Sequence, residues 1–311
     1  MNILITGGAG FIGAHLADIL LEQKHTVICI DNFELGTKNN LISAMQNPHF
    51  TLIEGNAADV ELMSNIMSKY YIEMVYHLAA NSDIQKSAIS PNIDFVNTFS
   101  TTYAVLEAMR RNNVKKLFFA STSAVYGEKT GILLTETAGE LAPISYYGGA
   151  KLASEAFISS YSYMNDLDVT IFRFPNVIGP RLTHGVIFDF IKKLKSNPFK
   201  LEILGDGTQE KPYIYVMDLV DAIIRVSQSG EQGVHIFNVG VESATTVKEI
   251  ADMVCQKMGL NDVHYEFTGG NRGWKGDVPK FQYDLTKIHQ WGWYPSHTSN
   301  EAVMTTLDHV L

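Results

Sequence analysis

The sequence predicts an α/β protein in which a doubly wound parallel sheet is joined to a smaller, mixed α/β region toward the C-terminus. Two observations support this fold class. Short apolar runs alternate with amphipathic stretches through the first half of the chain, and a glycine-rich turn follows the first run. A strand buried on both faces reads as a continuous apolar run, and helices cover those faces. With 311 residues, 46% of them hydrophobic, the chain is long enough to bury such a core.

Six apolar runs are the predicted strands, and two long amphipathic segments are the clearest predicted helices. The runs cover residues 2–6, 26–31, 50–54, 74–78, 116–120 and 169–173. The helices are expected over 92–112 and 147–165, because apolar residues recur there at helical spacing. Pro91 and Pro143 stand just ahead of them, where a helix start tolerates proline. Right-handed crossovers would place such helices on both faces of the sheet.

The first strand leads directly into a turn with glycines at positions 7, 10 and 13. Gly7, Gly10 and Gly13 permit a tight turn, allow backbone N–H groups to approach a pyrophosphate, and let the next helix pack closely. Asp31 ends the second predicted strand, where a carboxylate accepts hydrogen bonds from ribose hydroxyls and repels a 2′-phosphate. The pattern therefore predicts a Rossmann-type domain that binds NAD rather than NADP.

A second pattern indicates acid–base chemistry. Tyr147 and Lys151 are one helical turn apart, and so share a helix face. A nearby cation, together with the positive nicotinamide ring, is expected to lower the pKa of the phenol, which would then take a proton from a sugar hydroxyl. Thr122 and Ser123 supply hydroxyls at the end of the strand predicted over 116–120, at the sheet edge where Rossmann ligands bind.

Together these motifs resemble those of the extended short-chain dehydrogenase/reductase family. The residues that carry the resemblance are the glycine turn with Asp31, His77-Leu78-Ala79-Ala80, Thr122 to Gly127, Tyr147-x-x-x-Lys151, Arg173 to Arg181, Tyr213 to Asp218 and Gly276 to Pro279. Within that family the chain is most similar to the NAD-dependent nucleotide-sugar epimerases of the UDP-glucose 4-epimerase type. The similarity extends over nearly the whole chain.

The resemblance implies a catalytic set. Tyr147 is the implied general acid/base, and Lys151 is the cation that lowers its pKa and holds the nicotinamide ribose. Thr122 matches the hydroxyl that hydrogen-bonds the reacting sugar oxygen, and Ser123 is a neighbour able to share that task. Asn97 matches an asparagine that supports the catalytic helix and the bound cofactor. No metal site is implied.

The resemblance also implies two binding sets. The cofactor set is Gly7, Gly10, Phe11, Ile12, Gly13, Asp31, Asn32, Asn56, Ala57, Leu78, Ala79, Ala80, Asn97, Tyr147, Lys151 and Phe174. The substrate set is Ser82, Thr122, Asn176, Arg181, Lys211, Arg272 and Asp277. Two positions depart from the family pattern. Asn56 replaces an aspartate that meets the adenine amino group, and Arg272 is farther than usual from the following Gly-Asp, so Lys275 is an alternative contact for the diphosphate.

Two parts of the chain are expected to share the ligand. Residues 1–173 with about 213–242 form the predicted NAD-binding domain, and residues 174–212 with 243–311 form the predicted substrate-binding region. A cleft between them is the expected ligand site. The resemblance further implies a homodimer formed through the two long helices, whose pairing would give a four-helix bundle.

Residue 124 selects among the reactions of the family. Related dehydratases and decarboxylases tend to carry an acid just after the catalytic hydroxyl, whereas this chain has Ala124. Without that carboxylate, epimerisation at C4 of UDP-glucose or UDP-galactose through a 4-keto intermediate is the leading hypothesis. The alternatives are an epimerase for another nucleotide sugar (a UDP-uronic acid, an N-acetylhexosamine or another base), a nucleotide-sugar reductase or dehydratase, and, more remotely, a non-enzymatic NAD-sensing protein.

Composition excludes several other classes of partner. The formal net charge is −9 and the basic residues are scattered, so neither a nucleic acid nor an anionic membrane surface is an expected partner. The N-terminus has no basic leader and no long apolar run follows, so a cytoplasmic protein is expected. Cys29 and Cys255 lack metal-ligand spacing and are expected to be small, buried hydrophobic residues.

Overall fold

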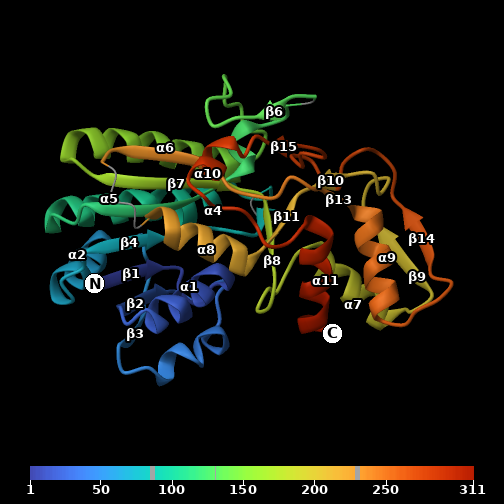
Figure 1. Ribbon diagram of the computed structural model, residues 1–311, viewed down its shortest axis with the longest axis horizontal. Coiled ribbons are helices and arrows are strands. Elements are labelled where there is room, and N and C mark those ends of the chain that lie inside the picture. The colour runs from blue at the N-terminus through green and yellow to red at the C-terminus, as the bar shows by residue number, and fades with distance from the viewer. Residues whose placement is uncertain (85–87, 130, 228–231) are drawn as a thin grey trace. The chain divides into compact units, whose positions relative to one another are not determined.

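The structure is a computed structural model that describes residues 1–84, 88–129, 131–227 and 232–311 (Figure 1). Its contacts divide the chain into two compact units. Unit 1 comprises Met1–Gly127, Glu140–Arg173 and Val220–Phe237, and unit 2 comprises Glu128–Gly139, Phe174–Leu219 and Asn238–Leu311. The division expected from the sequence differs in detail, since it assigned residues 213–242 to the first part and left 128–139 there.

Unit 1 is built on a seven-stranded sheet within the described residues. Its strands are β1 (Asn2–Thr6), β2 (Thr26–Asp31), β3 (Phe50–Glu54), β4 (Met74–His77), β5 (Lys116–Thr122), β7 (Asp168–Phe174) and β12 (Val234–Asn238). They lie in the order β12-β7-β5-β4-β1-β2-β3, and the pairs β1–β2, β1–β4, β2–β3 and β4–β5 run parallel. Successive strands are added on one side of β1 up to β3 and on its other side from β4 onward. The strand order therefore reverses between β1 and β4, which is where doubly wound sheets bind dinucleotides.

Helices pack on this sheet along their apolar faces. They are α1 (Phe11–Glu22), α2 (Val60–Lys69), α4 (Asn92–Asp94), α5 (Thr101–Asn112) and α6 (Tyr146–Asn165), with a π-helical segment η3 (Phe95–Ser100) joining α4 to α5. Shorter 3-10 turns are η1 (Lys38–Leu41), η2 (Ala44–Gln46) and η4 (Ser123–Tyr126). Buried residues of α2, α5 and α6 form one core with those of β1, β2, β4, β5 and β7. The α/β, Rossmann-type prediction is therefore confirmed.

The predicted elements compare closely with the structure. The first three strands have the predicted bounds, while β5 extends two residues beyond the prediction and ends on Thr122. The helix predicted over 92–112 is present as α4, η3 and α5 in succession, and α6 begins one residue early, at Tyr146. The seventh strand, β12, had no separate prediction. Both cysteines are buried, as expected.

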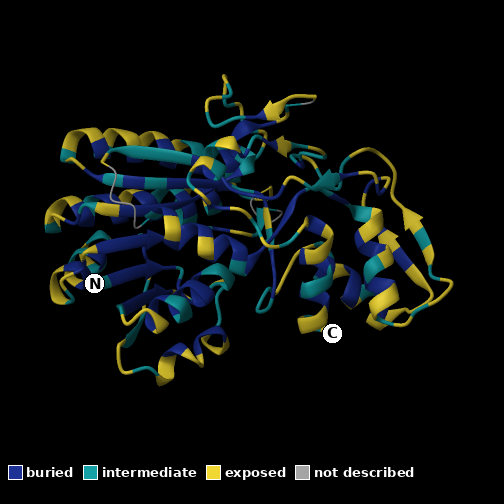
Figure 2. Cartoon of the chain, viewed as in Figure 1, coloured by how far each residue is buried: buried dark blue, intermediate teal, exposed yellow. Residues whose placement is uncertain are grey.

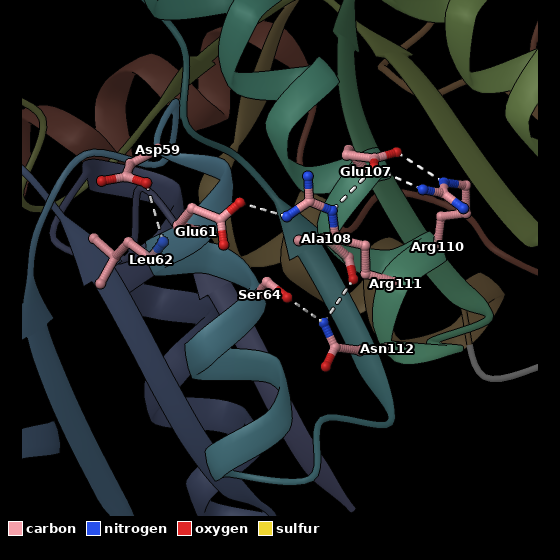
Figure 3. Close-up of polar contacts among 9 residues, drawn as sticks. All are labelled: Asp59, Glu61, Leu62, Ser64, Glu107, Ala108, Arg110, Arg111 and Asn112. Atoms are coloured by element: carbon pink, nitrogen blue, oxygen red, sulfur yellow. Dashed lines mark hydrogen bonds and ion pairs between the residues drawn. The ribbon is translucent and has the colours of Figure 1, made fainter.

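A group of ion pairs joins α2 to α5 at the surface of unit 1 (Figure 3). Arg111 pairs with Glu61 of α2 at 2.5 Å and with Glu107 of its own helix at 3.0 Å. Arg110 also pairs with Glu107. Hydrogen bonds from Arg110 are the largest influence on Glu107 and lower its pKa to about 2. Such exposed pairs stabilise a fold by only about 0–1 kcal/mol each, so the apolar core holds α2 against α5.

Unit 2 contains shorter elements. Its helices are α7 (Val186–Ser196), α9 (Val247–Lys257), α10 (Thr286–Gln290) and α11 (Ser299–Val310), and α8 (Val216–Ser227) crosses the unit boundary. Its strands are β6 (Leu133–Leu134), β8 (Asn176–Ile178), β9 (Lys200–Ile203), β10 (Glu210–Lys211), β11 (Tyr213–Tyr215), β13 (Thr245–Thr246), β14 (His264–Phe267) and β15 (Gln282–Tyr283). They pair two by two, as β10–β13, β11–β8, β14–β9 and β15–β6.

Burial follows the amphipathic pattern of each element (Figure 2). The strands β1, β2 and β4 are almost wholly buried, as expected for the centre of a sheet covered on both faces. The helices are buried on one side and exposed on the other. Among the described residues, no helix combines the length and the apolar character that crossing a bilayer requires.

Candidate functional site

The turn between β1 and α1 suits a bound phosphate group. Gly10 is the N-cap of α1 without a side-chain cap, and the first turn of the helix carries no acidic residue. Within the described residues, no side chain caps the N–H groups of this first helical turn, so they can bind an anion. Gly7 has φ +69°, and a Cβ there would lie 2.8 Å from the backbone nitrogen of Ala79, so only glycine fits.

Asp31 lies directly behind this turn. Its carboxylate accepts hydrogen bonds from the backbone N–H groups of Ala9 at 2.9 Å and Phe33 at 2.8 Å, and is 8% exposed. Burial raises the pKa of Asp31 above its usual range, and the backbone donors partly offset that effect. A carboxylate held at the end of β2 fits the ribose hydroxyls of NAD and would repel the 2′-phosphate of NADP.

The other predicted cofactor residues lie mostly along the same edge of unit 1. Phe11, Ile12 and Gly13 form the first turn of α1, and Leu78, Ala79 and Ala80 follow β4. Asn32 and Asn56 are exposed, and their side-chain oxygens accept hydrogen bonds from the N–H groups of Glu34 and Ala58. Ala57 is buried, and Phe174 belongs to unit 2.

The start of α6 positions the predicted catalytic pair. Ser145 caps this helix, accepting a hydrogen bond from the N–H group of Gly148 at 3.1 Å. A Cβ at Gly148 would lie 2.6 Å from the carbonyl oxygen of Ala124, so glycine lets the first turn of α6 approach η4. Because η4 directly follows Thr122, this close approach brings Tyr147 to the end of β5.

Tyr147, Thr122 and Lys151 are brought together as the sequence predicts. The Thr122 hydroxyl is close enough to the Tyr147 phenol to lower its pKa, against the larger effect of burial. Lys151 is 1% exposed, and its Nζ donates to the carbonyl oxygen of Ala120 at 2.6 Å. The same Nζ lies 5.9 Å from the centre of the Tyr147 ring and 4.7 Å from that of Phe119. A phenol, a hydroxyl and an ammonium group at one strand end can exchange a proton with an alcohol.

The largest effects of the chain itself raise the pKa of Tyr147, and the lowering predicted from Lys151 together with the oxidised nicotinamide stays a prediction for the cofactor-bound protein. Burial raises the pKa of Tyr147 above its ordinary value, and the carboxylate of Asp94 raises it further. Part of the Tyr147 side chain is solvent-accessible, but protein atoms surround it densely enough to disfavour the phenolate. Burial also lowers the pKa of Lys151 to about 7. In the chain alone, burial therefore favours the neutral phenol of Tyr147.

A buried ion pair lies beyond Lys151 on the same helix face and was missed from the sequence. Arg173 donates to both carboxylate oxygens of Glu155, at 3.0 and 2.6 Å, and to the hydroxyl of Tyr126 at 3.0 Å. The Ser121 hydroxyl also donates to Glu155. Glu155 lies four residues after Lys151, which is the spacing that could have revealed it. The network joins β5, η4, α6 and β7 around the predicted catalytic residues.

Four other residues singled out in the sequence occupy more peripheral or structural positions. Asn97 lies in η3, and its Nδ2 donates to Glu34 at 3.1 Å. Ser123 is half-buried and Ser82 is exposed. His77 is buried between the hydroxyls of Thr6 and Thr102, at 2.7 and 3.0 Å, which agrees with a structural role.

The predicted diphosphate contacts lie in unit 2, and two of the three cations are ion-paired. Lys211 pairs with Asp277. Arg272 Nη2 donates to both oxygens of the Glu128 carboxylate at 2.8 Å. Lys275 is exposed and has no ion pair within the described part of the chain. A phosphate group would have to compete with a carboxylate at Lys211 and at Arg272, but not at Lys275.

The last two predicted substrate residues lie at or just after β8. Asn176 begins this strand and is the register partner of Tyr213 on β11. Arg181 is half-buried and adopts φ +70°, an unusual conformation for a side chain of this size. The irregular sequence of residues 82–86 and 183–188 predicts two loops that select the sugar. The structure describes residues 183–188, whereas residues 85 and 86 lie outside the described residues.

Comparison with known proteins identifies similar chains. A family model described as the NAD dependent epimerase/dehydratase family matches residues 3–240. The UDP-glucose 4-epimerase of Mycolicibacterium smegmatis is 30% identical, over 99% of this chain and 98% of that protein. The structure of UDP-glucose 4-epimerase from Thermotoga maritima with UDP-glucose is 32% identical, covers 99% of this chain and 98% of that one, and has a TM-score of 0.90.

The overall fold does not separate the reactions of such proteins. A dTDP-glucose 4,6-dehydratase from Streptomyces venezuelae has a TM-score of 0.91 at only 24% identity, covering 99% of this chain and 96% of that one. At that identity the likeness concerns the fold alone. The choice between epimerisation and dehydration therefore depends on individual residues near Thr122 and Tyr147.

Proposed function

This chain belongs to the NAD-dependent epimerase/dehydratase family, and on that premise we propose that it interconverts UDP-glucose and UDP-galactose at C4. The observation that carries the proposal is the group formed by Tyr147, Thr122 and Lys151 at the end of β5, with Ala124 where related dehydratases carry an acid. This group can move a proton at a sugar hydroxyl. The family comparisons support NAD as the redox partner.

Each residue has a defined part in the proposed reaction. NAD, when bound, supplies the redox chemistry by accepting a hydride from sugar C4 and returning it. Tyr147 takes the proton of the 4-hydroxyl as hydride leaves and gives it back on return. Thr122 hydrogen-bonds the same sugar oxygen. Lys151 places positive charge beside Tyr147, and the oxidised cofactor adds the charge that ionisation of the phenol requires.

Binding is assigned to the residues predicted from the sequence. The uncapped start of α1 and Asp31 would hold the diphosphate and ribose of NAD. Lys211 and Arg272 would bind the diphosphate of the substrate, exchanging a carboxylate partner for a phosphate, and Lys275 could add a third contact. Rotation of the 4-keto sugar about that tether would expose its other face, so that hydride returns with inversion.

Ala124 argues against dehydration. A dehydratase needs a base to remove the proton next to the ketone, and an alanine side chain provides none. Glu155 does not replace that base, because its carboxylate is engaged by Arg173 and Ser121. Returning the hydride to the opposite face of the sugar requires no further group.

A panel of nucleotide sugars, read by product NMR, tests the proposal. Purified enzyme should convert UDP-glucose and UDP-galactose into one another without a 4-keto-6-deoxy product. A 4-keto-6-deoxy sugar, or no conversion of either C4 epimer, would refute the proposal. If only a UDP-uronic acid or a nucleotide N-acetylhexosamine is converted, the proposed epimerisation would stand and the proposed substrate would be wrong.

We further propose a homodimer formed through η3, α5 and α6. Phe95, Tyr103 and Phe157 leave 58%, 42% and 42% of their surface exposed on these adjacent elements. Phe99 packs edge-on against Phe157 at 5.0 Å, which makes the surface continuous across the two helices. An exposed aromatic surface of this kind is typical of a protein interface. The proposed location is the cytoplasm, whose reducing conditions suit two free cysteines.

Light scattering should give the mass of a dimer for the native protein. Phe95→Glu should shift the mass toward that of a monomer, because it buries a charge in the interface. Phe199→Glu, at a residue of unit 2 that is 74% exposed, is the matched control and should remain dimeric. A native monomer, or a Phe95→Glu variant that dimerises as tightly as the native chain, would refute the interface.

A further inference from the structure

Asp94 is a buried carboxylate that the proposed mechanism does not use. It ends α4 and is 1% exposed. Its Oδ1 accepts a hydrogen bond from Nδ2 of Asn81 at 2.9 Å, and its Oδ2 has no hydrogen-bond partner among the described residues. A carboxylate so placed is costly to bury unless an opposite charge compensates it. Its position beside the catalytic helix therefore needs an explanation.

The compensating charge is available on the helix against which α4 packs. That helix is α6, whose first turns carry Tyr147 and Lys151. Burial is the largest influence on both residues, raising the pKa of Tyr147 and lowering that of Lys151. Glu155 and then Asp94 raise the pKa of Lys151, and Asp94 also raises that of Tyr147. Asp94 therefore strengthens the effect of burial on the phenol and opposes it on the ammonium group.

Glu155 and His77 are the other titratable groups close to Lys151. Glu155 of α6 raises the pKa of Lys151 more than Asp94 does, but its carboxylate is itself paired with Arg173 of β7. His77 of β4 is neutral at working pH, because burial and the charge of Lys151 lower its pKa to about 3. In the described part of the chain, Asp94 is thus the carboxylate with an unpartnered buried oxygen that raises the pKa of both Tyr147 and Lys151.

We propose that Asp94 is a positioning residue that sets the proton affinity of the Tyr147–Lys151 pair and makes release of its proton depend on the oxidised cofactor. The inference rests on the proposed acid/base role of Tyr147. Asp94 and Lys151 together contribute no net charge, so a phenolate at Tyr147 needs one further positive charge. Oxidised nicotinamide carries that charge and the reduced form does not. The phenol would then ionise for the oxidation and recover its proton as the cofactor is reduced.

The first test is the pH dependence of the NAD-loaded enzyme. Two coupled groups lose their protons in steps that belong to the pair. Removing a nearby negative charge lowers the apparent pKa of each step. Asp94→Asn should therefore move the acid limb of the kcat/KM profile to lower pH by about one unit. Asp221→Asn makes the same chemical change at an exposed residue of α8, and should leave the limb in place.

The second test needs neither substrate nor turnover. Near-ultraviolet absorbance follows tyrosinate, and subtracting the matching Tyr147→Phe protein isolates one of the 14 tyrosines. In the NAD-loaded protein this signal should arise at lower pH in Asp94→Asn than in the native chain. A merely structural role for Asp94 would change the thermal midpoint and leave both titrations where they were.

The outcomes are separable. A folded Asp94→Asn protein with an unmoved acid limb and an unmoved tyrosinate step would overturn the inference. If that protein does not fold, Asp94→Glu and Asp94→Gln take its place, since they differ only in charge, and equal profiles for the two would overturn it. A native enzyme without activity on any nucleotide sugar would refute the proposed function, and the tyrosinate titration would still decide the role of Asp94.

Discussion

Replacing Tyr147 with phenylalanine is expected to lower kcat by roughly 10²- to 10⁴-fold, the range typical for loss of a positioned acid or base. The substitution removes the phenolic oxygen and keeps the ring, which lies 5.9 Å from Nζ of Lys151. The start of α6 is capped by Ser145 and needs no contact from the phenol. The variant should therefore keep its fold and its bound NAD, so the loss of kcat would reflect the missing proton transfer.

Tyr146→Phe is the matched control for this prediction. Tyr146 is the preceding residue, 56% exposed, and is given no part in the reaction. Its hydroxyl should be dispensable, with turnover within about twofold of the native value. Single-turnover reduction of bound NAD by UDP-glucose would compare the two proteins directly. Equal rates for Tyr147→Phe and the native enzyme would refute the assignment of Tyr147 as acid and base.

The largest expected effect on stability comes from Arg173. Its guanidinium is 2% exposed and neutralises Glu155, which is 5% exposed. Burial alone would lower the pKa of Arg173, but the hydrogen bonds and charge of Glu155 outweigh it and raise that pKa. Arg173→Met leaves a buried carboxylate without its partner, and should lower the free energy of unfolding by about 3–5 kcal/mol.

Denaturant unfolding of the native and variant proteins measures this loss. Adding Glu155→Leu to Arg173→Met removes the orphaned charge and should restore part of the stability. Arg225→Met, which breaks the exposed pair between Arg225 and Asp221, is the control and should cost less than about 1 kcal/mol. A similarly small cost for Arg173→Met would mean that the buried pair does not hold β7 to α6.

The sequence predicts the features of this protein that depend on local order along the chain. The turn after β1 is recognisable because strand, glycines and helix follow one another, and the glycines are required where backbones meet, as at Gly7. Tyr147 and Lys151 are recognisable because a helix places residues four apart on one face. The strand bounds are predicted well for the same reason, since buried parallel strands are continuous apolar runs.

Features that depend on packing between distant segments are not predictable in this way. Asp94 acquires its importance only when α4 packs against α6, and nothing in its neighbours along the chain signals that contact. Arg272 meets a carboxylate 144 residues away, at Glu128. The sequence predicts that a cation and the nicotinamide ring lower the pKa of Tyr147, but it does not reveal the opposing cost of burying a phenolate, which depends on how densely the folded chain surrounds it.

Following the hydrogen on C4 of the substrate tests the central claim most directly. UDP-glucose carrying deuterium at C4 should yield UDP-galactose that still carries deuterium at C4, because hydride leaves that carbon and returns to it without meeting water. Tyr147 exchanges only the hydroxyl proton, so deuterium on carbon is not lost through it. Product NMR reads the position of the label. UDP-galactose with solvent hydrogen at C4 would contradict the proposed reaction.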